Sequence, residues 1–198
     1  GILIKGGEPL EAAENIKAII FDKTGTLTNG KPEVTDVVSV GDFDEEDVLR
    51  ISASMEKLSE HSLAEAIYAH AQEEDVELDE VLDFAAIPGL GVSGSIDDKN
   101  YFFGNRKLIS DFADLDYSKI EKKVAKLEER GKTVMILASK EEIIGFIGVA
   151  DRVKATSKEA VDRLKNMGIE IYMVTGDNAR TAKAIAAEIG ITNVLSEV

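Results

Sequence analysis

One carboxylate in this chain stands where it could act as a nucleophile. Asp22 ends the apolar run Ile19-Ile20-Phe21 and is followed by Lys23, Gly25 and three threonines. Such a run predicts a strand buried on both faces of a parallel sheet, and ligands of these sheets bind beyond the carboxyl ends of the strands. Gly25 allows a tight turn whose amides and hydroxyls can face an anion. These residues suit attack by Asp22 on a phosphoryl group; the alternative is a strand-end cap with a threonine turn.

A second loop of the same kind follows a second apolar run. Thr175-Gly176-Asp177 comes directly after the apolar residues 171–174 and precedes a predicted helix. A hydroxyl and exposed amides at a helix N-terminus can bind phosphate. The alternative is that Asp177 or Asn178 only caps the helix. Two such loops at neighbouring strand ends favour a shared phosphate site.

The first loop also carries a recognisable signature. The string Asp22-Lys23-Thr24-Gly25-Thr26-Leu27-Thr28 resembles the phosphorylation signature of the P-type ATPases, within the haloacid dehalogenase superfamily. Residues 175–178 are similar to that family's second phosphate-site motif. The resemblance implies that Lys23, Thr175 and Gly176 hold the transferred phosphoryl group, and that Asp177 lies near the nucleotide or the metal. Asp151 and Lys154 resemble an acidic and basic pair of the same family, or else begin an ordinary solvated helix.

One position departs from the phosphatases of that superfamily. They carry a second Asp two residues after the nucleophile, which activates the water that hydrolyses the aspartyl-phosphate. This chain has Thr24 there. We therefore expect a long-lived phosphoenzyme, which suits a pump. A soluble phosphatase and a non-catalytic nucleotide-binding module are the alternatives.

Hydrophobic periodicity outlines the elements that must position these residues. It predicts helices over residues 8–15, 44–57, 61–74, 118–130, 155–167 and 178–189, and strands over 16–22, 33–40, 81–87, 91–96, 101–103, 134–139, 143–149 and 169–174. The βαβ rhythm of the two ends differs from the antiparallel middle. We predict an α/β domain with a parallel sheet (residues 1–32 and 151–198), interrupted by an α+β domain with an antiparallel sheet (33–150). The resemblance implies that the first is a haloacid-dehalogenase-like phosphorylation domain and the second a nucleotide-binding domain.

The predicted insertion contains residues suited to an adenine. Glu60 and His61 resemble the start of a helix in the nucleotide-binding domain of heavy-metal P-type ATPases, with Ser62 in place of the family's proline. An imidazole can stack on a purine, and a carboxylate can hydrogen-bond its edge. As alternatives, His61 could be an ordinary helix-start histidine, or it could ligate a metal together with Glu65.

Glycines mark two further pieces of the insertion. Gly89 and Gly91 belong to a Gly-x-Gly-x-x-Gly string, but a strand and hairpin turn follow it, whereas a dinucleotide-binding fold needs a helix there. The string therefore predicts a strand whose backbone lies close to a nucleotide, or else a bulge. Gly104 and Asn105 resemble the family's second glycine element, with Asn105 as a polar contact.

The composition limits the classes of function. The net charge of −15 argues against nucleic-acid binding, and the 44% apolar and 31% charged fractions are typical of a soluble globular protein. No apolar run is long enough to cross a bilayer, and there is no cysteine for a disulfide or a thiolate metal site. A bound nucleotide would need Mg²⁺ or local cations to offset the negative charge.

Together these features predict part of an enzyme. Asp22 would attack Mg²⁺-ATP, with the Asp22 carboxylate and the Thr24 carbonyl binding the metal. The resemblance implies a copper-type pump, working at the cytoplasmic face of a membrane with the remaining domains of the pump. The transported metal cation would pass through a transmembrane domain that is absent here. A lysine motif and a Gly-Asp-Gly loop of the family are also absent from the sequence. We therefore expect a C-terminally incomplete fragment that binds nucleotide and autophosphorylates poorly.

Overall fold

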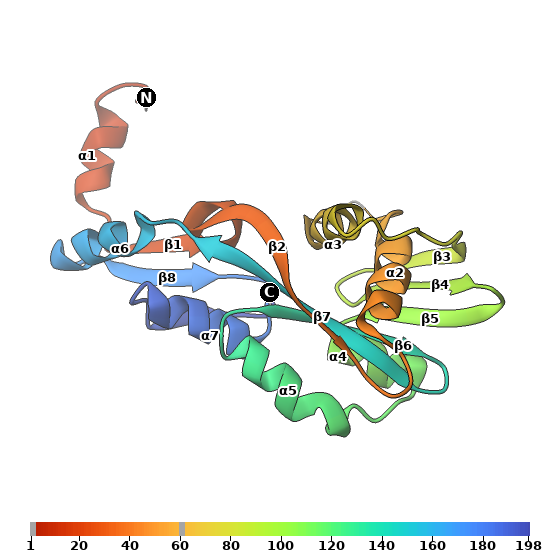
Figure 1. The fold of residues 1–198 in the computed structure, drawn as a ribbon. Coiled ribbons are helices and arrows are strands. Elements are labelled where there is room, and N and C mark those ends of the chain that lie inside the picture. Colours follow the sequence, from red (N-terminus) through yellow and green to blue (C-terminus); the bar gives the residue numbers. More distant parts are fainter. Residues whose placement is uncertain (1–2, 60–61) are drawn as a thin grey trace. The chain divides into compact units, whose positions relative to one another are not determined.

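The computed structural model describes residues 3–59 and 62–198, which form two compact units (Figure 1). Unit 1 contains the described residues up to Asn29 together with Val153–Val198, and unit 2 contains Gly30–Arg152. The predicted boundaries, 32/33 and 150/151, lie within three residues of these divisions. Unit 1 is thus assembled from two segments that are far apart in the sequence.

Unit 1 is built on a parallel sheet of three strands in the order β1-β8-β9. The strands are β1 (Ala18–Asp22), β8 (Glu170–Val174) and β9 (Asn193–Leu195). The helices of this unit are α1 (Glu8–Glu14), α6 (Ser157–Asn166) and α7 (Ala179–Glu188). Side chains from β8, α6 and α7 form its core, which includes Met173, Val161 and Ile185.

The first strand differs from its prediction. Ile19 and Phe21 pack against the core of unit 1, whereas Ile20, on the other face, is 63% exposed. Side chains alternate between the two faces of a strand, so only one face of β1 is covered within the described part of the chain. The prediction that this strand is buried on both faces is therefore wrong.

Unit 2 is built on a sheet of six strands in the order β2-β7-β6-β5-β4-β3. These strands are β2 (Thr28–Ser39), β3 (Leu82–Ile87), β4 (Gly91–Ile96), β5 (Lys99–Gly104), β6 (Thr133–Ser139) and β7 (Ile143–Val153). Pairing is antiparallel from β3 through to β7. Asp97 and Asp98 form the two-residue turn between β4 and β5, both with positive φ (48° and 63°), as a tight hairpin requires.

Helices cover both faces of this sheet (Figure 1). On one face lie α2 (Glu45–Glu56) and α3 (Ser62–Glu73), and on the other lie α4 (Arg106–Leu108), the turn η2 (Ile109–Ala113) and α5 (Ser118–Glu128). Successive residues of β5 serve the two layers: Phe103 packs beneath α2 and α3, and Phe102 beneath α5. The predicted fold class, a parallel α/β sheet with an antiparallel α+β insertion, is confirmed.

The strand that leads into unit 2 begins five residues before its predicted start at residue 33. It is β2, which runs from Thr28 to Ser39. Gly30 has φ +70°, and Pro32 is tolerated because β2 is an edge strand that can lack a donor. The short elements at 106–113 were not predicted. No helix within residues 3–59 and 62–198 has the length and apolarity to cross a membrane.

Candidate active site

The two motif loops begin side by side at the ends of paired strands. β1 and β8 run parallel with Asp22 opposite Val174, so the turn η1 (Lys23–Leu27) and residues 175–177 leave the sheet at the same edge. This is the edge at which open α/β sheets bind ligands. The structure thus brings together the two loops whose sequences predicted a shared phosphate site.

Asp22 is anchored through its backbone and accessible at its side chain. It pairs with β8 as the last residue of β1, has an extended backbone (φ −68°, ψ 141°), and its side chain is exposed. No residue in the described part of the chain forms a hydrogen bond or ion pair with its carboxylate. A rigidly held carboxylate that is open to solvent is suited to nucleophilic attack.

The turn after Asp22 is held by its own hydrogen bonds. The Thr28 hydroxyl, fully buried, donates to the carbonyl of Lys23 (3.0 Å) and accepts from the amide of Gly25 (3.2 Å). Gly25 has φ +73°, a conformation that side chains disfavour. Lys154 reaches the same turn, because its Nζ donates to the Gly25 carbonyl at 2.6 Å. The predicted glycine turn is therefore rigid, and it is tied to the segment that returns from unit 2.

An ion pair connects the two motif loops. Lys23 Nζ lies 2.5 Å from Asp177 Oδ2, and each side chain is only 9% exposed. The Thr175 hydroxyl donates to the same Asp177 oxygen (3.0 Å) and accepts from the Asp177 amide (3.1 Å). The ion pair and these hydrogen bonds join the two loops. Lys23, Thr175 and Asp177, chosen from sequence alone, thus form one network.

The helix cap that follows comes from a different residue. Asn178 accepts hydrogen bonds from the amides of Arg180 (3.0 Å) and Thr181 (3.1 Å) and so caps α7. Of the two candidates for the cap, Asn178 therefore fills that position. Gly176 is exposed, and a Cβ added there would meet nothing nearer than 3.8 Å. Its amide lies in the open loop that was predicted to face an anion.

Asp151 and Lys154 make contacts beyond those of an ordinary helix start. The Asp151 carboxylate accepts from the amides of Gly30 (3.0 Å) and Lys31 (3.3 Å). Ser157, at the start of α6, donates to the Leu27 carbonyl at 2.7 Å. Both strands through which the chain changes unit, β2 and β7, are therefore fastened near their crossing points.

The two predicted glycine elements of unit 2 pack against each other. Gly91 of β4 lies directly opposite Gly104 of β5. A Cβ on Gly91 would come within 2.2 Å of the Phe103 carbonyl, and a Cβ on Gly104 within 2.2 Å of the Leu90 carbonyl. Close strand packing alone accounts for both glycines. Gly89 differs, because it lies in a turn with φ +73° and open space around it.

Asn105 uses its side chain within the protein. Its Nδ2 donates to the Gly89 carbonyl at 2.9 Å, and its Oδ1 accepts from the Leu108 amide at 3.1 Å, which caps α4. These bonds fix the Gly89 turn against the end of β5. The resemblance implies that Asn105 is a polar contact for the nucleotide; its bonds in the structure position the Gly89 turn.

Sequence reasoning missed one buried carboxylate, Glu56, which precedes Glu60 by four positions in the sequence. Glu60 and His61 lie outside the described residues. Glu56, at the end of α2, is only 4% exposed, and burial raises its pKa to about 7, partly offset by a hydrogen bond with Ser59. Neither Glu56 Oε2 nor the buried Ser52 hydroxyl one turn earlier has a partner among the described residues. The signal was helical spacing, which puts both on one face with Leu49.

The oxygen atoms predicted to bind Mg²⁺ are present but few. Asp22 is exposed, and the backbone at Thr24 is extended (φ −75°, ψ 123°). No cluster of three or more His, Cys, Asp or Glu side chains within the described ranges could hold a metal ion. Mg²⁺ commonly keeps several waters and binds through one or two carboxylates plus substrate phosphates. The donor set here fits that mode.

Comparison with known proteins relates the whole chain to one superfamily. Residues 16–198 match the haloacid dehalogenase-like hydrolase family. The chain is 43% identical over 191 residues to a probable copper-importing P-type ATPase A of Enterococcus hirae, covering 96% of this chain and 25% of that protein. It is 46% identical over 198 residues to a copper-exporting P-type ATPase of Staphylococcus haemolyticus, covering 100% of this chain and 24% of that protein.

A solved structure extends the similarity to the fold. The catalytic domain of the CPx-ATPase CopB-B superposes with a TM-score of 0.70 at 30% identity, covering 99% of this chain and 67% of that one. The resemblance to heavy-metal P-type ATPases that the signature indicated is thus confirmed. The chain spans about a quarter of the length of the curated relatives it matches.

Proposed function

The chain belongs to the haloacid dehalogenase-like hydrolase family, and from this premise we propose that it is the ATP-binding, phosphorylated part of a copper-transporting P-type ATPase. The observation that carries the proposal is the pairing of Asp22 with Val174, which sets an exposed carboxylate beside the Thr175–Asp177 loop. Similarity to copper-importing and copper-exporting pumps over at least 96% of the chain supports the same assignment.

The proposed reaction transfers a phosphoryl group to Asp22. A carboxylate oxygen of Asp22 forms a bond to the γ-phosphorus of ATP while the bond to the bridging oxygen breaks, and ADP leaves. Lys23, Thr175 and the Gly176 amide bind the transferred group. Since Lys23 is paired with Asp177, binding the phosphoryl group requires Lys23 to share or exchange that partner. Asp177 in this view sets the position of Lys23 before the substrate arrives.

Mg²⁺ completes this account. The Asp22 carboxylate and the Thr24 carbonyl would hold it, together with the phosphates of ATP. When bound, it offsets the charge that builds on the transferred oxygens. Thr24 stands where a phosphatase would carry its second acid, so no carboxylate at that position activates water. The aspartyl-phosphate therefore lasts long enough to serve a transport cycle.

Unit 2 is proposed to bind the adenosine end of ATP. Glu60 and His61 would contact the base, and the Gly89 turn, with its open surroundings, would let the backbone approach the nucleotide. Gly91, Gly104 and Asn105 support that turn by close strand packing and by hydrogen bonds. Unit 2 would be the nucleotide-binding domain and unit 1 the phosphorylation domain.

The remaining predictions concern the whole pump. We propose that the units act at the cytoplasmic face of a membrane and pass the energy of the phosphoenzyme to a transmembrane domain. The cargo would be a copper ion, as in the named activities of the relatives. The other domains of the pump would be the partners of this chain.

Phosphate labelling of a pump that carries this sequence tests the proposal. ATP radiolabelled on its γ-phosphate should give an acid-stable, hydroxylamine-sensitive label, and Asp22→Asn should abolish it. Asp42→Asn, an exposed carboxylate change in unit 2, is the matched control and should leave the label intact. Undiminished labelling of the Asp22→Asn protein would refute the assignment of the nucleophile.

A further inference from the structure

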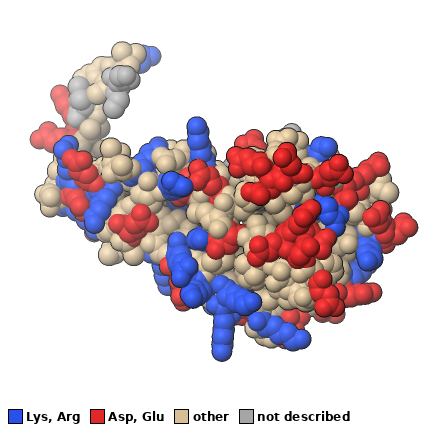
Figure 2. All heavy atoms as spheres, viewed as in Figure 1, with Lys and Arg blue, Asp and Glu red and all other residues tan. Residues whose placement is uncertain are grey.

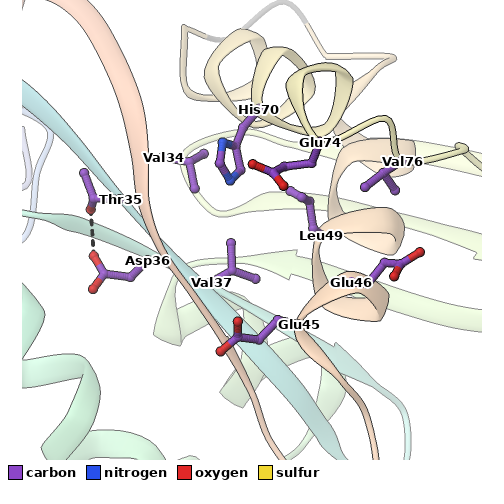
Figure 3. Close-up of a pocket in the computed structure, with 10 residues that line it drawn as sticks. All are labelled: Val34, Thr35, Asp36, Val37, Glu45, Glu46, Leu49, His70, Glu74 and Val76. Atoms are coloured by element: carbon purple, nitrogen blue, oxygen red, sulfur yellow. Dashed lines mark hydrogen bonds between the residues drawn. The ribbon is translucent and has the colours of Figure 1, made fainter.

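Unit 2 contains a cavity of about 460 Å³ that includes none of the predicted site residues. It lies between β2, α2 and the end of α3 (Figure 3). Its apolar lining comes from Val34, Val37, Leu49 and Val76. Its polar lining includes Glu45, Glu46, Glu74 and His70. We call this cavity, which Thr35 and Asp36 also line, the acidic groove.

Three carboxylates of the acidic groove are available to a ligand. Among the residues that the structure describes, Glu45, Glu46 and Glu74 form no side-chain hydrogen bond or ion pair, and all three are exposed. Asp36 also lines the cavity, but its carboxylate has partners. Burial opposes its ionisation, but hydrogen bonds from Lys132 (2.5 Å) and Thr35 (2.7 Å) outweigh burial and lower its pKa. The negative charge available to a ligand therefore belongs to the three glutamates.

Local helix stability explains two of these glutamates and not the third. Glu45 and Glu46 lie in the first turn of α2, where the helix dipole favours negative charge. Glu74 follows directly after the last residue of α3, where the same dipole disfavours a carboxylate. Figure 3 shows Glu74 and His70 extending from this end of α3 toward Leu49. Glu74 thus adds negative potential to a cavity whose lining is part apolar and part polar, at some cost to its own helix.

The arrangement of charge limits the occupant. An anion such as a nucleotide would be repelled, so the groove differs from the proposed ATP site. A single metal ion does not fit either, because no three acidic or histidine side chains within the described ranges are close enough to share one. Three glutamates beside the apolar side chains of Val34, Val37 and Leu49 match a ligand that has several positive charges and an apolar side.

We propose that the acidic groove binds a basic amphipathic segment of a partner protein. Its apolar side chains would pack on Val34, Val37 and Leu49, and its lysine or arginine side chains would pair with the three glutamates. Acidic side chains gather over the part of unit 2 that holds α2 and α3 (Figure 2). The net charge of −15 adds a long-range attraction that would raise the association rate of such a partner.

A synthetic peptide provides the test. The probe is a fluorescein-labelled helical peptide with leucines on one face and lysines on the other, titrated with the whole chain by fluorescence anisotropy. The variant Glu45→Gln/Glu46→Gln/Glu74→Gln should weaken binding about tenfold, equivalent to about 1.4 kcal/mol. The matched control, Glu129→Gln/Glu141→Gln/Glu188→Gln, makes the same change in net charge at exposed sites outside the groove and should alter binding less than about twofold.

The outcomes separate this proposal from its rivals. Equal weakening by the two triple variants, or equal affinity for a scrambled peptide of the same composition, would mean general charge attraction and would overturn the proposal. Absence of binding at low ionic strength would overturn it as well. Sedimentation velocity would measure self-association of the chain. If the groove variant lost self-association and kept its affinity for the peptide, the occupant would be a second copy of the chain and the proposal would be overturned. ATP affinity, measured in parallel, should be the same in all three proteins, so a failure of the ATP assignment remains separately visible.

Discussion

Replacing Glu56 by glutamine should raise the stability of unit 2 at neutral and alkaline pH. The Glu56 side chain is 4% exposed, and burial raises its pKa from 4.5 to about 7, with the hydrogen bond to Ser59 only partly offsetting this. Its Oε2 has no partner in the described part of the chain. Ionisation of Glu56 therefore opposes folding, and glutamine keeps the shape of the side chain while removing the charge.

The sign and size of the effect follow from proton linkage. A raised pKa in the folded state means that the folded protein holds the Glu56 proton more tightly than the unfolded chain does. Stability therefore falls as the pH rises from about 4.5, and the loss is complete above about pH 7. A change from 4.5 to about 7 corresponds to about 3 kcal/mol at 1.36 kcal/mol per pKa unit. The advantage of the variant should grow by about that amount between pH 4 and pH 8.

Urea unfolding followed by the NMR signals of unit 2 would measure this difference. Comparing the two proteins at each pH cancels the titration of the other carboxylates. Glu77→Gln, at an exposed site, is the control and should show a nearly constant difference from the wild type. If the Glu56→Gln advantage were the same at pH 5 and pH 8, burial would not govern the ionisation of Glu56 and the reasoning would fail.

Three further predictions concern other parts of the fold. Thr28→Val should destabilise unit 1 by about 2 kcal/mol in thermal unfolding, because it removes two buried hydrogen bonds, whereas Thr26→Val, at an exposed site, should cost under about 0.5 kcal/mol. Gly104→Ala should lower the free energy of unfolding by more than about 3 kcal/mol, because its Cβ would lie 2.2 Å from a backbone carbonyl. Gly176→Ala, with nothing nearer than 3.8 Å, should lower it by under about 1 kcal/mol. Unfolding of both variants can be followed by circular dichroism. Thr24→Asp, in a pump that carries this sequence, should shorten the phosphoenzyme half-life at least about tenfold in a chase experiment, because it supplies a base for water; an unchanged half-life would contradict the role given to Thr24.

The strand-end chemistry could be predicted because it depends on local sequence. An apolar run that ends in Asp22, and another that ends in Thr175, are visible without coordinates. The βαβ rhythm then predicts that the two strands are parallel, which sets both loops at one edge of the sheet. The parallel pairing of β1 with β8 has this arrangement. No knowledge of side-chain packing was required for that step.

Features that depend on packing between distant segments could not be predicted. The exposure of Ile20 depends on which elements cover each face of the sheet in unit 1. The spacing of residues does not reveal that Gly91 and Gly104 lie opposite each other at a distance that excludes a Cβ. The pattern of glycines resembled a ligand site, whereas close packing of β4 against β5 explains why Gly91 and Gly104 are glycines. Ligand contact in this region is therefore best sought at Gly89, whose surroundings are open.

The charges around Asp22 bear on the need for a metal. Lys23 is paired with Asp177, and Lys154 is bonded to the Gly25 carbonyl, so both lysines that contact the motif loops already have partners. Among the described residues of these contacts, two lysines stand against Asp22 and Asp177, which leaves no surplus positive charge there for a triphosphate. The net charge of −15 makes that deficit greater. The proposed binding of ATP at Asp22 would therefore depend on a divalent cation that arrives with the nucleotide, and Lys23 would orient the phosphoryl group more than it attracts the nucleotide.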